Sequence, residues 1–284
     1  GWVAIVHGHP LYGVLLGVTL LGSAFVGVRS FRPSPRRAGW RRVADVAVLL
    51  MALGWVALMG WLRPFTAVEP ALPALQSDAR ITVTESPTRI VLTPTGPAST
   101  TGLFFQPGAR VDSRAYAAIL RPVAEAGHVV VIVKQPLGIA FLATKAIDAT
   151  APGQQHVTRW VVGGHSLGGT VAAMQAGATD TDPTRPVVGL LLFASYPASD
   201  ISTSLGAPAL SIAGSRDGLA TPDKIAASMA LLPAGATFMS VEGAVHSFFG
   251  DYGAQPGDGT PTISQDAARA EISRAAVDFV DTLS

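Results

Sequence analysis

Residues 159–170 read R-W-V-V-G-G-H-S-L-G-G-T. The apolar run Trp160–Val162 is typical of a buried strand, and residues 167–178 suit a helix. Between them, Gly164–Gly168 has the pattern G-x-S-x-G, whose glycines let a strand turn sharply into a helix. Such a turn strains its central residue beside a helix N-terminus that favours negative charge. We therefore expect Ser166 to be a nucleophile; the simpler interpretation is a glycine-rich turn that contains a serine.

The chain from Ile81 onward alternates between strand and helix patterns. This alternation predicts a mostly parallel sheet with helices on both faces, and ligands then bind at the carboxyl ends of the strands. The expected strands are Ile81–Thr84, Arg89–Thr93, Gly102–Phe105, His128–Val133, Trp160–Val162, Val187–Phe193, Ala209–Ala213 and Thr237–Val241, and the expected helices span residues 112–126, 139–149, 167–178, 223–232 and 265–283.

An activated serine needs a general base, which is most often a histidine. Of the six histidines, His246 follows the last expected strand, at the carboxyl end of the sheet. The others fall in the apolar N-terminal region, at the start of a strand, in a loop before the nucleophile strand, or directly before Ser166, where the side chain projects differently. His246 is therefore the expected base, although a lone histidine is more often a surface or packing residue.

The base needs a carboxylate to fix its tautomer. Asp217 is expected in this role because it lies in the loop after strand Ala209–Ala213, and the order Ser166, Asp217, His246 is that of α/β-hydrolases. Asp223 is the alternative, but the preceding Pro222 indicates a helix start, where Asp ordinarily caps. Asp200 lies one strand too early.

The oxyanion hole is expected to combine the N–H of Leu167 with an N–H from the loop after strand Gly102–Phe105. That loop contains Pro107, which has no N–H, so Gly108 or Ala109 must donate. The sequence leaves the choice between them open. It also leaves open whether residues 134–138 line the pocket or form an ordinary strand-to-helix loop. The glycine-rich residues 248–261 either fold over the site or cover the edge of the sheet.

From about Ile81 to Leu283 the chain resembles an α/β-hydrolase of the serine esterase/lipase type, through F-F-Q-P-G-A, G-G-H-S-L-G-G, G-S-R-D-G and V-E-G-A-V-H. It is particularly similar to a bacterial group, related in architecture to dienelactone hydrolases, that shares Q-P-L-G-I-A-F and F-G-D-Y-G-A-Q-P-G-D-G. The resemblance implies about eight strands and the triad Ser166, Asp217 and His246. Serine replaces the cysteine of dienelactone hydrolases proper, so their lactone substrate does not transfer. Only Ala194–Pro208 lies where a cap would insert, so no large cap domain is expected.

Two apolar segments precede this domain. Leu11–Val28 carries no charge and Val43–Leu62 carries only Asp45, and both are long enough to cross a bilayer as helices. The loop 29–42 between them holds six arginines, so the positive-inside rule predicts that it is cytoplasmic and that the following domain is extracytoplasmic. Buried helices of a soluble protein are the alternative, and a cleaved signal peptide fits less well. Because the chain begins with Gly1 rather than Met, the true N-terminus is left open.

We therefore expect a membrane hairpin over residues 1–64, a linker over 65–80 and a hydrolase domain over 81–284. Residues 1–64 hold seven arginines and one acidic residue, so the remainder is mildly acidic, which argues against nucleic acid as a partner. The 284 residues contain no cysteine and no H-E-x-x-H pattern, and we expect no metal and no cofactor. The expected partners are a small-molecule ester and the lipid bilayer; the oligomeric state is not predicted.

Together these features predict a membrane-anchored serine hydrolase that cleaves carboxylic esters through an acyl-enzyme intermediate. A non-catalytic binding or scaffold protein on the same fold is one alternative. A thioesterase, peptidase or acyltransferase would use the same triad, and only the pocket and the acceptor would differ.

Overall fold

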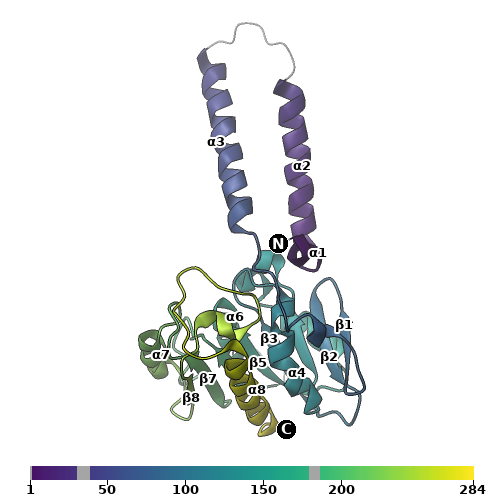
Figure 1. The fold of residues 1–284 in the computed structure, drawn as a ribbon, viewed down its shortest axis with the longest axis vertical. Coiled ribbons are helices and arrows are strands. Elements are labelled where there is room, and N and C mark those ends of the chain that lie inside the picture. The colour runs from purple at the N-terminus through teal and green to yellow at the C-terminus, as the bar shows by residue number, and fades with distance from the viewer. Residues whose placement is uncertain (1, 31–38, 179–185) are drawn as a thin grey trace.

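Eight strands form one sheet in the order β1-β2-β4-β3-β5-β6-β7-β8 in the described residues, 2–30, 39–178 and 186–284, of the computed structural model (Figure 1). The strands are β1 (Ile81–Glu85), β2 (Arg89–Pro94), β3 (Thr101–Gln106), β4 (Val130–Val133), β5 (Arg159–His165), β6 (Val187–Phe193), β7 (Ala209–Gly214) and β8 (Thr237–Val241). Strands β3 to β8 pair in parallel, whereas β1 and β2 are antiparallel. The mostly parallel sheet of eight strands is confirmed.

Helices cover both faces of this sheet. They are α4 (Ala117–Glu125), α5 (Ala146–Thr150), α6 (Leu167–Gly177), α7 (Pro222–Ser228) and α8 (Gln265–Asp281). Successive side chains of a strand point to opposite faces, so Phe105 joins the core cluster under α4 and α8 and Phe104 joins the cluster under α6. Both phenylalanines are fully buried. The central strands are therefore apolar on both sides, as a covered parallel sheet requires.

Two of the predicted helices are interrupted. Residues 113–116 form a 3₁₀ turn, η2 (Ser113–Tyr116), before α4, although Asp112 does cap the segment by accepting from the N–H of Arg114 at 3.1 Å. Residues 223–232 are helical only to Ser228, after which η6 (Met229–Leu231) follows.

The helix predicted over residues 139–149 is confirmed only in part, because the helical residues are divided among short pieces. The chain instead forms η3 (Pro136–Gly138), η4 (Ala140–Ala143), α5 and η5 (Ala151–Gly153). Side chains take the carbonyls that a continuous helix would use, since Gln106 Nε2 donates to Ala143 at 3.1 Å and Gln175 Nε2 to Thr144 at 2.7 Å. These two hydrogen bonds hold the segment against the end of β3 and the last turns of α6.

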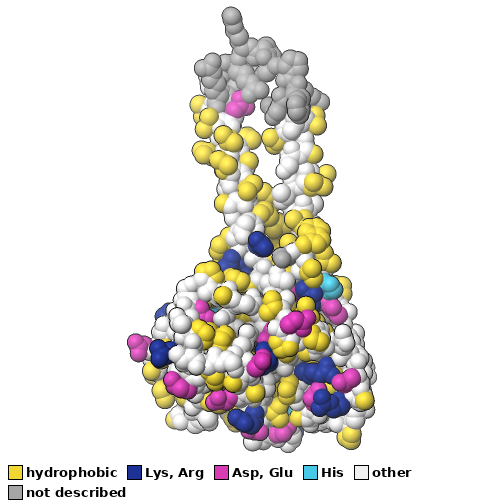
Figure 2. Space-filling model, in the orientation of Figure 1, with side chains coloured by type: hydrophobic (Ala, Val, Ile, Leu, Met, Phe, Trp, Pro, Cys, Tyr) yellow, Lys and Arg dark blue, Asp and Glu magenta, His cyan; other side chains and the backbone are white. Residues whose placement is uncertain are grey.

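A helical hairpin extends from the domain (Figure 1). It consists of α1 (Trp2–Val6), α2 (Leu11–Ser30) and α3 (Gly39–Trp61), and Leu11–Val28 and Val43–Trp61 are candidate membrane spans by length and hydropathy. Hydrophobic side chains follow both helices, whereas most of the charged side chains in this view lie on the globular part (Figure 2). Of the predicted arginine-rich loop 29–42, residues 31–38 lie outside the described residues.

The segment assigned as a linker lies against the domain. Phe65 pairs with Val111 in an isolated parallel bridge, and η1 (Pro73–Leu75) follows it. Ala67 and Ala71 are buried. Residues 65–80 are therefore held in contact with the carboxyl end of β3 and with α4.

Candidate active site

Ser166 lies between β5 and α6 with φ of 52° and ψ of −124°. Its N–H donates to the carbonyl of Phe193 at 3.0 Å. A Cβ at Gly164 would lie 2.4 Å from the carbonyl carbon of Gly168, and one at Gly168 would lie 2.1 Å from the carbonyl oxygen of Gln106. Glycine is required at both positions, and the strained turn leaves the Ser166 side chain partly exposed, as the G-x-S-x-G pattern predicts.

Asp217 and His246 form a buried pair. Asp217 lies just after β7 and His246 after β8, and His246 Nδ1 is 2.8 Å from Asp217 Oδ2. The other carboxylate oxygen, Oδ1, accepts from the N–H groups of Leu219 at 2.7 Å and Ala220 at 2.8 Å. These contacts fix the carboxylate and hold the Nδ1 edge of the imidazole against it. Within the described residues, Nε2 of His246 has no hydrogen-bond partner.

One pocket of about 200 Å³ contains both Ser166 and His246. It opens at the carboxyl ends of β5 to β7, where a ligand site is expected in a parallel sheet. Its lining is formed by Ser166, Leu167, Thr170, Ala194, Ser195, Tyr196, Leu219, Ala220 and His246. The three residues predicted from their order along the chain are thus brought to one site: two line the pocket, and Asp217 lies behind His246.

The loop after β3 presents two N–H groups that differ in their partners. The N–H of Gly108 donates to Tyr116 Oη at 2.8 Å. The N–H of Ala109 has no acceptor among the described residues, and Ala109 is partly exposed. Leu167 is the first residue of α6, so its N–H has no acceptor within the helix.

Sequence reasoning missed a second buried histidine beside the base. His165 Nδ1 is 2.8 Å from Tyr116 Oη, and the imidazole ring centroid lies 4.6 Å from that of His246. The ring of His165 also stacks on Phe249 with an interplanar angle of 11°. Burial, and then the charge of His246, lower the pKa of His165 well below its ordinary value, so His165 is neutral at pH 7.

Asp258 was also missed. Its carboxylate accepts from the N–H groups of His246 at 2.9 Å, Ser247 at 2.8 Å and Gly259 at 2.7 Å. Burial alone would raise the pKa of Asp258, but these N–H groups lower it below its ordinary value. The glycine-rich loop 248–261 therefore returns to brace the start of η7 (His246–Phe249), which carries the base.

The loop 134–138 braces the site from another side. Gln135 Nε2 donates to the carbonyl of Pro107 at 3.0 Å and to Gln106 Oε1 at 2.9 Å. Residues 134–138 do not line the pocket that contains Ser166. This loop thus supports the segment that carries Gly108 and Ala109.

The candidates that sequence reasoning set aside lie elsewhere. Asp223 is exposed in the first turn of α7, and exposed Asp200 accepts from the N–H of Ser202 at 2.8 Å. His128 lies at the amino edge of the sheet, where its Nε2 is 2.7 Å from Asp281. Among the residues that the structure describes, no three His, Cys, Asp or Glu side chains come together as a metal site requires.

A sequence profile described as the α/β hydrolase family matches residues 102–270, which is more than half of the chain. The chain belongs to the α/β hydrolase family. The site lies where this fold places its reactive groups, at the carboxyl ends of the strands. None of the curated proteins compared with the chain matches it in sequence.

Solved structures share the α/β hydrolase fold. A predicted CIB-like hydrolase from Thermoplasma acidophilum is 16% identical with a TM-score of 0.55, covering 72% of this chain and 100% of its own. A dienelactone hydrolase from Anabaena variabilis is 17% identical with a TM-score of 0.52, and the match covers 73% of this chain and 98% of the dienelactone hydrolase. A monoacylglycerol lipase from Paleococcus ferrophilus is 14% identical with a TM-score of 0.54, and the match covers 72% of this chain and 100% of the lipase. At these identities the likeness establishes the fold.

Proposed function

We propose that the chain is a serine esterase whose catalytic residues are Ser166, His246 and Asp217. The observation that carries the proposal is the unpartnered Nε2 of His246, held by Asp217 at the pocket that Ser166 also lines. The esterases and lipases among the structures of similar fold support ester hydrolysis as the general activity. A lone serine in a glycine-rich turn would not need a buried, oriented imidazole beside it.

In the proposed reaction, Ser166 Oγ attacks the ester carbonyl carbon while His246 Nε2 takes the hydroxyl proton. The carbonyl oxygen becomes an oxyanion as the tetrahedral intermediate forms. The C–O bond to the leaving group then breaks, and His246 gives its proton to the departing alcohol. Water attacks the acyl group on Ser166 in the same way and releases the carboxylic acid. Asp217 stabilises the imidazolium in both halves of the reaction.

The proposed oxyanion hole consists of the N–H groups of Leu167 and Ala109. Gly108 is the weaker of the two candidates left open by the sequence, because its N–H already donates to Tyr116. A preorganised donor of this kind contributes about 2.7–4 kcal/mol to transition-state stabilisation.

Labelling with a fluorophosphonate tests the nucleophile directly. The full chain in detergent micelles should form an adduct that mass spectrometry locates on Ser166, and the Ser166→Ala and His246→Ala variants should not be labelled. Ser195→Ala is the matched control, because Ser195 lines the same pocket but its hydroxyl donates to the carbonyl of Ser166 at 2.6 Å. An adduct on Ser195, or a folded wild-type protein that takes no label, would overturn the proposal.

We also propose that α2 and α3 cross the cell membrane and that the catalytic domain is extracytoplasmic. The two apolar helices and the arginines between them support this orientation. Because the chain contains no cysteine, single-cysteine variants report topology cleanly. In intact cells a membrane-impermeant maleimide should label Ser284→Cys, and it should label Ser34→Cys only after lysis. The reverse pattern would refute the orientation.

A further inference from the structure

The helical hairpin stands on the same edge of the sheet as the candidate active site (Figure 1). Phe65, four residues after α3, donates its N–H to the carbonyl of Arg110 at 2.7 Å, and its carbonyl accepts from the N–H of Asp112 at 2.9 Å. The guanidinium of Arg110 lies 4.7 Å from the ring centroid of Trp61 and donates to the Trp61 carbonyl. The loop that contains Ala109 is therefore fastened to the base of α3.

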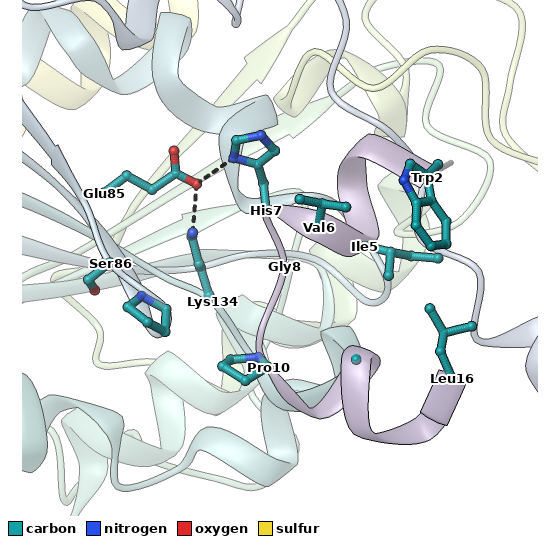
Figure 3. Close-up of a pocket in the computed structure, with 12 residues that line it drawn as sticks. Trp2, Ile5, Val6, His7, Gly8, Pro10, Leu16, Glu85, Ser86 and Lys134 are labelled. Atoms are coloured by element: carbon teal, nitrogen blue, oxygen red, sulfur yellow. Dashed lines mark hydrogen bonds and ion pairs between the residues drawn. The ribbon is translucent and has the colours of Figure 1, made fainter. Parts of the chain in front are cut away.

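Other loops of this edge contact the hairpin or the segment that follows it. In that segment, the N–H of Val68 donates to the carbonyl of Asp251, five residues after the proposed base, at 2.8 Å. At the start of the hairpin, His7 Nδ1 lies 3.1 Å from Glu85 Oε1, and Lys134 Nζ lies 2.6 Å from the same oxygen (Figure 3). Glu85 ends β1 and Lys134 follows β4 at its carboxyl end. With α2 and α3 in a bilayer, the carboxyl edge of the sheet faces the membrane surface.

An uncharged apolar segment lies on this membrane-facing edge. Residues 136–143 read P-L-G-I-A-F-L-A, and within it Phe141 and Leu142 are 47% and 55% exposed. A Cβ at Gly138 would lie 3.1 Å from Tyr12 Oη on α2, so the segment starts against the hairpin. Its other end is held at the end of β3 by Gln106, as described above. Two large apolar side chains are thus exposed on a segment that runs from the contact with Tyr12 to the end of β3.

The pocket itself is too small to enclose a long acyl chain. Its volume of about 200 Å³ lies below the roughly 300–1,000 Å³ of pockets that enclose drug-sized ligands. A long-chain ester bound with its carbonyl at Ser166 must therefore extend out of the mouth. On this edge of the domain, the apolar phase available outside is the bilayer that holds the hairpin.

From this geometry we infer that the substrate is the carboxylic ester of a long-chain amphiphile in the same bilayer, and that residues 136–143 contact the membrane surface. The inference rests on the proposed esterase function. Because the hairpin places the enzyme in the same membrane as the ester, the local concentration of the ester at the active site is high. Phe141 and Leu142 hold this edge of the domain against the membrane interface by burying apolar surface in it.

Proteoliposomes of the full chain test the inference. The matrix is ether-linked phosphatidylcholine, which has no carboxylic ester, and the probe is dioleoylglycerol placed either in the enzyme's own vesicles or in separate vesicles at equal bulk concentration. Release of oleate should be at least about tenfold faster from the shared vesicles. Hydrolysis of water-soluble p-nitrophenyl butyrate by the same vesicles reports the esterase function separately, and Ser166→Ala should abolish both activities.

The double variant Phe141→Ser/Leu142→Ser tests the membrane contact. Its rate on dioleoylglycerol should fall about tenfold, whereas its rate on p-nitrophenyl butyrate should stay within about twofold, which also verifies that it folds. Met229→Ser is the matched control, because Met229 is 52% exposed but lies beyond α7, towards the β8 end of the sheet. It should leave both rates unchanged.

The outcomes separate the two proposals. Three results would each overturn the inference and leave the esterase function intact. They are equal rates from shared and separate vesicles, hydrolysis of the butyrate without hydrolysis of dioleoylglycerol, and a double variant whose rates on both substrates match those of Met229→Ser. No hydrolysis of either ester would overturn the esterase function, and the inference with it.

Discussion

Replacing Asp217 by asparagine should reverse the hydrogen bonding of His246 while leaving the shape of the site unchanged. Oδ1 of Asp217 accepts from two N–H groups, those of Leu219 and Ala220, so the amide oxygen of the asparagine must take that position. The amide NH₂ then faces His246 Nδ1, which lies 2.8 Å from Oδ2 in the wild type. Nδ1 must become an acceptor, and the proton moves to Nε2.

The consequence for catalysis is large. A His246 protonated on Nε2 cannot take the proton of Ser166, and the asparagine cannot stabilise an imidazolium. An Asp-to-Asn change of this kind costs about 10⁴-fold in kcat, which corresponds to about 5.5 kcal/mol of transition-state stabilisation. The value of KM should change little, because Asp217 does not line the pocket.

The assay is hydrolysis of p-nitrophenyl butyrate by the full chain in detergent, with near-UV circular dichroism to verify the fold. Asp223→Asn is the matched control: it makes the same chemical change on the exposed first turn of α7 and should retain full activity. If Asp217→Asn lost less than about tenfold in kcat, or if Asp223→Asn lost as much, the assignment of Asp217 would be refuted.

Three further changes test the surroundings of the site. Tyr116→Phe leaves the buried N–H of Gly108 without its acceptor and should lower the free energy of unfolding by about 1–3 kcal/mol, measured by urea denaturation; an unchanged stability would contradict this. Folding lowers the pKa of His165 below its ordinary value of 6.5, so the unfolded chain binds more protons and the free energy of unfolding decreases as the pH falls below 6.5. Between pH 7 and 5 the wild type should therefore lose more stability than His165→Asn, and parallel curves of stability against pH would refute this. A Cβ at Gly168 would lie 2.1 Å from the carbonyl of Gln106, so Gly168→Ala should displace the loop after β3. The variant that folds should have a kcat about 10²-fold lower than the wild type, and a wild-type kcat would refute the role of this loop in catalysis.

Much of the fold follows from local patterns in the sequence. The glycines around Ser166 predicted the strained turn because only glycine fits such close backbone contacts, and the order of strands predicted that residues following β7 and β8 would reach the same edge. The predictions of a nucleophile, a base and a carboxylate remain to be tested by chemistry. Their positions, however, are compatible with those roles.

What the sequence did not predict depends on contacts between distant segments. His165 was set aside as the base because it projects differently from Ser166, and nothing local indicates that Tyr116 lies 2.8 Å from it. The hydrogen bond from the N–H of His246 to Asp258 could likewise not be predicted from the sequence of the glycine-rich loop. The helix predicted over residues 139–149 is divided after Ala143, where Gln106, more than thirty residues earlier, donates to the carbonyl.

The contacts of residues 65–68 carry a consequence for proteolytic release of the domain. A cut before Phe65 would free the domain with its backbone bonds to Arg110, Asp112 and Asp251 intact. A cut between Val68 and Ile81 would leave Phe65 and Val68 on the membrane side, so the loops of the candidate active site would no longer be covalently linked to the residues that form these bonds. Release before Phe65 would therefore keep these contacts within the released domain, whereas release after Val68 would remove them from it.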